Sequence, residues 1–383
     1  MRILIAPNSF KGSLDAFGVA EAIADGLARS VHGVTTVLLP VADGGDFTTA
    51  VLVRGLGGRI VESTVLGPLG RKVTAAWGML DDGTTAVIEV AQASGLSLLR
   101  TEERDPMIAT SYGAGELVRD ALSHGRKRII VGLGGSATVD GGAGLAEALG
   151  ARFLDANGAP VARGGAGLAA LERIDVTALD ARLGDAEIVA ACDVDNPLLG
   201  EDGAAKRYGP QKGATPDQVE ALESNLSRFA DVIHRGLGRD VRRVRHGGAA
   251  GGMAAGIAGI LGGRLASGID LVLDCLGFDE RLRSCDLVVT AEGFLDRQTL
   301  ENKAPYGVAR AAERQHIPVV VMAGGIADDV TRSAFSIFDA IVPICPRPMS
   351  LDEAMSKTRD RLTWSAEQLG RILSLVVRGS STT

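Results

Sequence analysis

A run of glycines with three polar side chains between them lies at residues 132–144, directly after a short apolar stretch. Its sequence is GLGGSATVDGGAG. Glycines let backbone amides crowd around an anion, and a helix that begins at their end adds about half a positive charge there. The segment therefore predicts a loop that holds phosphate between a strand and a helix.

Two other interpretations of this loop stay open. Residues 132–137 fit the dinucleotide fingerprint G-x-G-x-x-G/A, and Asp155 lies near the place of a ribose-binding acid. The fit is loose, because further residues precede the helix and this helix spans only roughly eight residues, too short for an ordinary crossover. A structural turn without a ligand is the third interpretation, since glycine-rich turns are common. The extra Ser, Thr and Asp suit phosphate oxygens and a metal better than a nicotinamide pyrophosphate.

Five other polar segments could converge on the same site, most of them directly after predicted strands. They are residues 7–13, 41–46, 191–198, 209–213 and 290–298, the last continuing to Asn302 and Lys303. The carboxyl ends of parallel strands meet at the ligand crevice of an α/β sheet. The candidate catalytic residues are Lys11, Asp43, Asp193 and Asp296. The candidate cofactor-binding residues are Gly134, Gly135, Ser136, Thr138, Lys212, Glu292 and Lys303.

The chemistry of these residue types is that of phosphoryl transfer. Lys11 and Lys212 would neutralise a phosphoryl group, while Asp43, Asp193 and Asp296 are candidates for metal ligand and general base, in an order that stays open. The five histidines stand on predicted helix ends or polar loops away from these segments; they are His32, His124, His234, His246 and His316. A Ser-His-Asp arrangement or a His-rich metal centre therefore finds no support.

Composition limits the class of protein. The chain has 383 residues, 46% of them hydrophobic, and a net charge of -7 with acids and bases interspersed. This balance makes nucleic acid and anionic membranes poor partners and leaves small anionic metabolites as ligands. The four cysteines form no C-x-x-C pair, and the apolar start of the chain is too short for a signal peptide or a membrane span. We expect a cytoplasmic protein and leave a homo-oligomer open.

Alternating strand-like and helical segments predict an α/β fold in two domains. The expected architecture is a Rossmann-like parallel-sheet domain formed by residues 1–47 and 277–383. A second α/β domain, residues 48–276, is inserted into it, with a cleft between the two domains. Residues 59–90 break the alternation with three strand-like segments and predict an antiparallel meander. A C-terminal helix is expected at 351–376.

Nine motifs of the chain, in order, resemble those of the bacterial glycerate kinase family. They are IAPNSFKGSL (5–14), VADGGD (41–46), GPLGRKV (67–73), IEVAQASGL (88–96), GLGGSATVDGGAG (132–144), ACDVDNPLLG (191–200), GPQKGA (209–214), GAAGGM (248–253) and AEGFLDRQT (291–299). The resemblance implies a two-domain α/β enzyme that uses ATP and Mg²⁺. It also implies D-glycerate as the substrate and phosphorylation mostly at the 2-hydroxyl, to 2-phosphoglycerate, with 3-kinase regiochemistry as the alternative.

Two of these motifs depart from the family's pattern. The usual ADGGEGT stands here as ADGGDFT, so Asp46 replaces a glutamate and Phe47 a glycine. If that glycine has a positive φ, Phe47 strains the loop, and a catalytically weakened glycerate- or nucleotide-binding protein becomes the alternative function. In the last motif Ala291 and Asn302 replace glycines. Asn302 tolerates a left-handed conformation, whereas Ala291 requires a negative φ or close packing.

Overall fold

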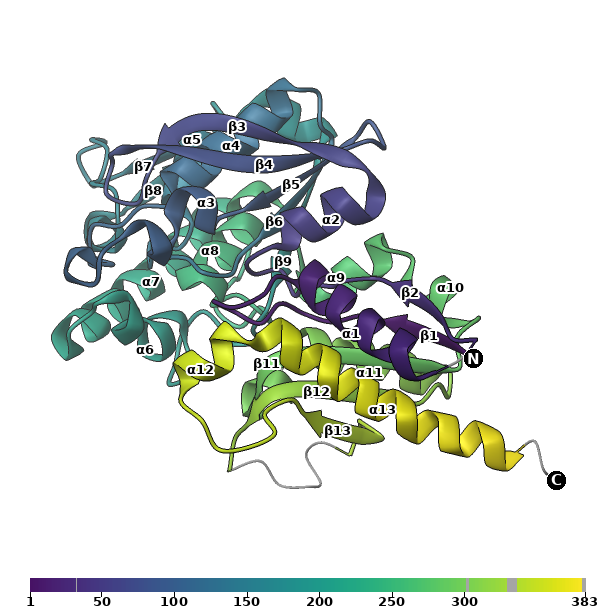
Figure 1. Ribbon diagram of the computed structural model, residues 1–383. Helices are drawn as coiled ribbons and strands as arrows, with labels where there is room; N and C mark the ends of the chain where they lie inside the picture. The colour runs from purple at the N-terminus through teal and green to yellow at the C-terminus, as the bar shows by residue number, and fades with distance from the viewer. Residues whose placement is uncertain (32, 301–302, 329–335, 381–383) are drawn as a thin grey trace. The chain divides into compact units, whose positions relative to one another are not determined.

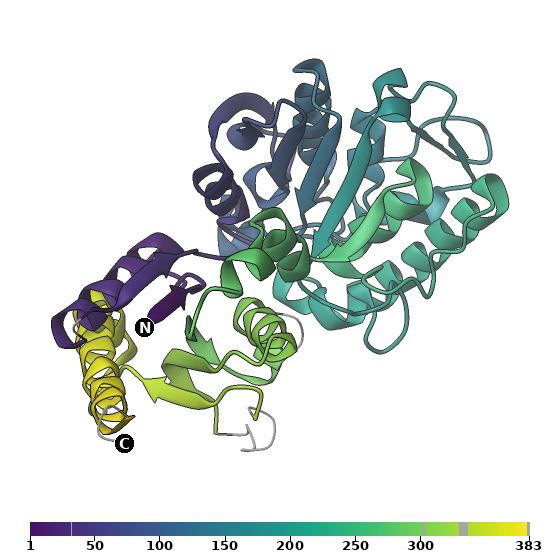
Figure 2. The same ribbon diagram turned by 90° about the vertical axis from the view of Figure 1, so that its right-hand side faces the viewer.

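The structure is a computed structural model of the chain, and it describes residues 1–31, 33–300, 303–328 and 336–380. It divides into two compact units. The first contains Met1–Asp43 and Ile269–Thr383, and the second contains Gly44–Gly268. Both are α/β units, as Figures 1 and 2 show. No helix of the described residues is long and apolar enough to cross a membrane.

The first unit is a five-stranded sheet in the order β13-β12-β11-β1-β2, with every neighbouring pair parallel. Its strands are β1 (Arg2–Ile5), β2 (Thr35–Leu38), β11 (Leu287–Leu295), β12 (Val319–Ile326) and β13 (Ala340–Pro343). Its helices are α1 (Ala16–Ser30), α9 (Gly268–Cys275), which starts at the last residue of the second unit, α10 (Phe278–Leu282), α11 (Ala304–Arg314), α12 (Leu351–Ser356) and α13 (Thr358–Ser380). The central strands β1 and β11 are apolar and buried because helices cover the sheet.

Helices α1 and α13 lie side by side along this sheet (Figure 1). Their backbones approach closely where α1 has glycine: a β carbon at Gly26 would run into the carbonyl oxygen of Thr363 and lie 2.7 Å from the β carbon of Ala366. The predicted single C-terminal helix is wrong, because α12 and α13 are separate and Lys357 between them has φ -120 and ψ 23.

The second unit contains a six-stranded sheet in the order β10-β9-β6-β5-β4-β3 and a two-stranded sheet, β7-β8. Its strands are β3 (Gly58–Leu66), β4 (Lys72–Leu80), β5 (Thr85–Glu89), β6 (Arg128–Gly132), β7 (Arg152–Leu154), β8 (Arg173–Asp175), β9 (Glu187–Cys192) and β10 (Arg264–Ser267). Strands β3, β4 and β5 are antiparallel, and β5, β6, β9 and β10 are parallel. The carboxyl ends of β5, β6 and β9 therefore lie at one edge of this sheet.

The helices of the second unit are α2 (Thr48–Leu56), α3 (Ala91–Ser94), α4 (Tyr112–Ser123), α5 (Ala143–Ala148), α6 (Ala204–Tyr208), α7 (Pro216–Leu237) and α8 (Ala249–Gly256). Helix α7 begins at Pro216 because Thr215 and Gln218 form a capping box, and it ends at Gly238, which is left-handed. Two apolar clusters stabilise this unit. One surrounds Trp77 on the sheet, and the other surrounds Phe229 of α7.

The borders of the units differ from the predicted 48 and 276. The second unit starts at Gly44, because the carbonyl oxygen of Gly44 accepts a hydrogen bond from the amide of Gly134 at 3.3 Å. It ends at Gly268, since Ile269 already packs against Gly307 of α11 in the first unit. The alternation of strand-like and helical segments in the sequence could not locate these borders, because the borders depend on contacts between segments far apart in the chain.

Gly26→Ala should destabilise the first unit, because the new β carbon overlaps α13. We expect a loss of about 2 kcal/mol in the free energy of unfolding, measured by denaturant titration. Gly236→Ala in α7 is the matched control, since nothing lies within 4 Å of its β-carbon position. It should stabilise the protein by about 0.5–1 kcal/mol. Equal effects of the two variants would contradict the packing argument.

Candidate functional site

The glycine-rich loop follows β6 at the carboxyl edge of the six-stranded sheet. Gly135 has φ +73, which favours glycine, and a β carbon at Gly134 would lie 2.5 Å from the Cα of Gly45. The amide of Ala137 donates to Ser94 O at 2.8 Å, and the amide of Leu96 donates to Gly135 O at 2.9 Å. The loop is therefore held closely between neighbouring segments rather than open on all sides.

The expected anion site at the start of α5 is wrong, because the protein's own Asp140 fills it. Asp140 has no exposed surface, and its carboxylate accepts hydrogen bonds from Ser111 N and Ser111 Oγ, both at 2.8 Å. It also accepts from Gly142 N at 3.0 Å and Gly144 N at 3.3 Å, and burial raises its pKa. The helix itself has only six residues. Phosphate could therefore contact only the earlier part of the loop.

Lys212, Ser136 and Thr138 come together in this earlier part. Lys212 is 3% exposed, and its Nζ donates to Ser136 Oγ at 2.9 Å and to the carbonyl oxygen of Thr138 at 2.8 Å. Burial lowers the pKa of Lys212 to about 7, against the opposing charges of Asp140 and Asp193. Thr138 Oγ1 is buried without a hydrogen-bond partner among the described residues. The structure thus brings Lys212 into contact with Ser136 and Thr138, which follow Gly134 and Gly135 on the loop.

Asp193 follows β9 and is half-buried beside the loop, since a β carbon at Gly134 would lie 3.6 Å from Asp193 Oδ2. The prediction that the histidines stand away from the polar segments is wrong for His246. Its Nδ1 lies 2.7 Å from Val194 O and 3.0 Å from Asp195 Oδ1. Sequence gave no signal for this contact, because 52 residues separate His246 from Val194. His32 lies outside the described residues.

A second set of predicted residues gathers in the first unit, where β11 ends. Glu292 is 8% exposed, and Thr299 Oγ1 donates to its Oε2 at 3.2 Å. Burial, with the charges of Asp43 and Asp296, raises the pKa of Glu292 to about 8 against the opposing charge of Lys303. Lys303 Nζ lies 3.9 Å from Asp296 Oδ1. Four predicted residues, Glu292, Asp43, Asp296 and Lys303, therefore form one electrostatic cluster.

Lys11 and Asp43 are less enclosed than Glu292. Lys11 is exposed on the connection between β1 and α1, and Asp43 Oδ2 accepts from Asn8 Nδ2 at 3.5 Å. Ala291 is buried within β11 and has no positive φ, as its substitution requires. Asn302 lies outside the described residues.

The predicted metal ligands are divided between the units: Asp43 and Asp296 belong to the first and Asp193 to the second. Within residues 1–31, 33–300, 303–328 and 336–380, no three His, Cys, Asp or Glu side chains form a group that could hold a metal ion. Mg²⁺ needs no such group, because it binds through one or two carboxylates and keeps waters and substrate phosphates as its other ligands. The oxygen donors near Glu292 fit that requirement.

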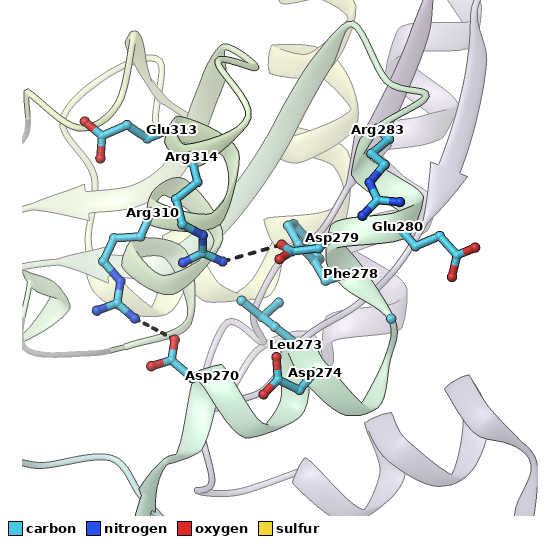
Figure 3. Close-up of a pocket in the computed structure, with 11 residues that line it drawn as sticks. Asp270, Leu273, Asp274, Phe278, Asp279, Glu280, Arg283, Arg310, Glu313 and Arg314 are labelled. Carbon is cyan, nitrogen blue, oxygen red and sulfur yellow. Dashed lines mark hydrogen bonds and ion pairs between the residues drawn. The ribbon is translucent and has the colours of Figure 1, made fainter.

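A pocket of about 590 Å³ in the first unit lies away from the predicted residues (Figure 3). Its lining comes from α9, α10 and α11 and the segments beside them, and includes none of the candidate site residues. Arg310 is paired with Asp270 and Arg314 with Asp279. Arg283 also lines the pocket, and we assign the pocket no ligand.

Phe47 lies at the start of α2 with φ 71 and ψ 2, a left-handed conformation. The glycine that the family motif has here would adopt it freely, whereas a residue with a β carbon pays roughly 1–2 kcal/mol. Phe47 therefore holds a conformation that favours glycine, at the cost of local strain. Phe47 is also 44% exposed, so burial of its ring does little to offset that strain.

Parallel sheets whose carboxyl ends carry a glycine loop with a buried lysine and a group of carboxylates are typical of α/β enzymes that act on phosphorylated ligands. Comparison with known proteins identifies the family to which this chain belongs. The sequence profile of the Glycerate kinase family matches residues 3–374. The chain belongs to this family, which confirms the resemblance of its motifs and makes it a member of a kinase family.

Known relatives match over their whole length. The Glycerate 2-kinase of Escherichia coli K12 is 44% identical over 99% of this chain and 100% of that protein. The Glycerate kinase of Bacillus subtilis 168 is 44% identical over 98% of both chains. The crystal structure of a putative glycerate kinase 2 from Salmonella typhimurium LT2 is 42% identical, covers 100% of both chains and has a TM-score of 0.86. This likeness confirms the α/β fold class.

Phe47→Gly should raise the melting temperature, because it removes the left-handed strain, worth about 1 kcal/mol after the greater freedom of glycine in the unfolded chain is subtracted. Differential scanning calorimetry measures the shift. Phe47→Ala is the control: it removes the ring but keeps a β carbon in the same conformation, so no comparable gain is expected. A gain of equal size in both variants would show that the ring, not the backbone, is the cause.

The contribution of Glu292 to thermal stability should fall as pH rises from about 5 to about 8, because Glu292 stays protonated in the folded state while the unfolded carboxyl, with an ordinary pKa of 4.5, ionises. The folded state then binds more protons, so each rise in pH favours unfolding. Glu292→Gln should flatten this dependence in melting curves taken from pH 5 to 9. The exposed Glu280→Gln should leave it unchanged. Parallel curves for wild type and Glu292→Gln would contradict the raised pKa.

Proposed function

We propose that this protein transfers the γ-phosphoryl group of ATP to the 2-hydroxyl of D-glycerate and releases 2-phosphoglycerate. The observation that carries the proposal is the full-length identity of 44% with a protein named Glycerate 2-kinase. The grouping of Lys212, Ser136 and Thr138 on the glycine-rich loop supports it, because phosphoryl transfer needs positioned donors and cations more than covalent chemistry.

In the second unit, Gly134, Gly135, Ser136 and Thr138 would form the anion-binding loop. Hydroxyl and amide donors on a rigid loop hold a charged oxygen without having to reorganise. Lys212 would add positive charge to this loop, because its ammonium group contacts Ser136 and Thr138. In the first unit, Lys11 is exposed and would reach a phosphate or carboxylate oxygen as a point charge.

Asp43 and Asp296 in the first unit and Asp193 in the second are the candidates to hold Mg²⁺, which when bound would neutralise charge on the phosphate oxygens. One of the three would also accept the proton of the acceptor hydroxyl as general base. Glu292 is unsuited to that role below pH 8, since its carboxyl stays protonated there. With Lys303, it would instead provide hydrogen-bond donors to the nucleotide.

The test is direct. Purified protein with D-glycerate, ATP and Mg²⁺ should release ADP and a phosphoglycerate in a coupled assay. Proton-coupled ³¹P NMR of the product distinguishes the hydroxyls, because the ester of the 2-hydroxyl couples to one proton and that of the 3-hydroxyl to two. A 3-phosphoglycerate product would overturn the regiochemistry and leave the kinase assignment in place.

Lys11→Ala and Asp296→Ala should each lower kcat by orders of magnitude, because each removes a charge that the transition state would use. Steady-state kinetics with both substrates saturating measures the effect. Lys357→Ala, at an exposed lysine of the same unit, is the control and should keep wild-type rates. A near-wild-type kcat in either test variant removes that residue from the site.

A catalytically weakened binding protein is the alternative, and the strained Phe47 is the observation that favours it. In that case the wild type binds ATP and D-glycerate in calorimetry without turnover, and Phe47→Gly creates activity. Measurable turnover in the wild type rejects this alternative.

A further inference from the structure

Lys212 is held in place by rigid backbone. It ends the 3₁₀ turn η5 (Pro210–Lys212), and the next residue, Gly213, has φ +98. A β carbon at Gly213 would collide with the carbonyl oxygen of Arg104, so this turn packs directly against neighbouring backbone. The amides of Lys212 and Gly213 donate to Gly209 O and Pro210 O, both at 3.0 Å. The backbone that carries the ammonium group of Lys212 is therefore fixed relative to the glycine-rich loop.

The direction of the hydrogen bond between Lys212 and Ser136 follows from chemistry. While Lys212 is protonated, its ammonium group donates and cannot accept, so Ser136 Oγ is then the acceptor at 2.9 Å. A serine hydroxyl has one proton, and this proton must then point away from Lys212. The carbonyl oxygen of Thr138, which can only accept, takes another ammonium proton at 2.8 Å. Charged Lys212 thus makes Ser136 a donor toward some other group.

Lys212 is committed to the loop, since two of its three ammonium protons are donated to Ser136 Oγ and to the carbonyl oxygen of Thr138. Its side chain is enclosed by the loop, and the residue is 3% exposed. Ser136, 4% exposed, follows Gly134 and Gly135 on the loop that carries the proposed anion site. The helix end farther along the loop is already filled by Asp140. The Ser136 hydroxyl is therefore the polar group of this loop through which Lys212 could act on a ligand.

We propose that Lys212 is a positioning residue that orients the Ser136 hydroxyl as a hydrogen-bond donor to an anionic oxygen of the substrate, a nucleotide phosphate or the glycerate carboxylate. This inference rests on the proposed function for the identity of the two ligands. It replaces the sequence-based role of Lys212 as a direct phosphate contact. The essential feature is that Lys212 and Ser136 act as one unit.

A double-mutant cycle tests this coupling. Lys212→Met, Ser136→Ala and the double variant are compared with wild type in calorimetric titrations with MgATP and, separately, with D-glycerate. We expect both single variants to weaken binding of one of these ligands at least tenfold, as for loss of a hydrogen bond to a charged group. The double variant should bind no more weakly than the single variants. The ligand that responds identifies the anion.

Two further variants, together with Ser136→Ala from the cycle, separate positioning from a merely structural role. Lys206→Met is the matched control. Lys206 lies on α6 and is paired with Glu201, so this variant should change neither affinity. Ser136→Thr keeps the hydroxyl and should bind within threefold of wild type. Ser136→Ala leaves the contact of Lys212 with Thr138 intact, so it tests the donor even if Lys212→Met does not fold.

The outcomes that overturn the inference are distinct from those that overturn the proposed function. Additive effects in the cycle, or unchanged affinity for both ligands in Ser136→Ala, reject the positioning role. A wild-type protein that binds neither ligand rejects it as well. Wild-type protein that binds ATP but phosphorylates no D-glycerate rejects the proposed function only, and the cycle then still decides the role of Lys212 with MgATP as the probe.

Discussion

Two buried charges, the carboxylate of Asp140 and the ammonium of Lys212, hold the glycine-rich loop of the second unit in shape. A loop of glycines has little of its own to fix a conformation, because glycine loses more backbone freedom on folding than any other residue. Asp140 accepts two hydrogen bonds from the end of the loop, at Gly142 and Gly144, and two from Ser111. Lys212 donates two hydrogen bonds to the middle of the loop. Burying each charge is costly, and these contacts together with their mutual attraction offset that cost.

This arrangement differs from a phosphate loop that offers its helix end to the ligand. The positive end of α5 is neutralised internally, so ligand binding has to depend on the part of the loop around Ser136. The first unit follows a different principle. There, Asp43 and Asp296 face the buried Glu292, whose carboxyl remains protonated instead of adding a third negative charge. A cation at this place, such as Lys303 or a metal ion, would then face two negative charges, those of Asp43 and Asp296, and not three.

Backbone strain is concentrated beside the loop of the second unit. Of the four non-glycine residues with positive φ among those described, His316 lies in the first unit, and Phe47 lies two residues after Gly45, which approaches Gly134. His246 contacts the segment of Asp193, and Ala250 precedes Gly251, whose carbonyl oxygen accepts from Gly141 N at 3.1 Å. Such conformations persist only where the surroundings over-determine them, and they tend to occur at functional sites.

The sequence alone determined the α/β class, because apolar runs alternate with helical patterns, and it indicated strands without helices at 59–90, where the structure has β3, β4 and β5. The spacing of glycine, lysine and acid residues also marked the segments that carry Lys212, Ser136 and Glu292. Tertiary structure decided how these groups act. Three features depend on contacts between residues from two to more than 70 positions apart. They are the position of Asp140 at the start of α5, the contact of His246 with Val194, and the enclosure of Lys212. Residue type and spacing cannot reveal them, because the same lysine or aspartate would bind a ligand if exposed and supports the fold when buried.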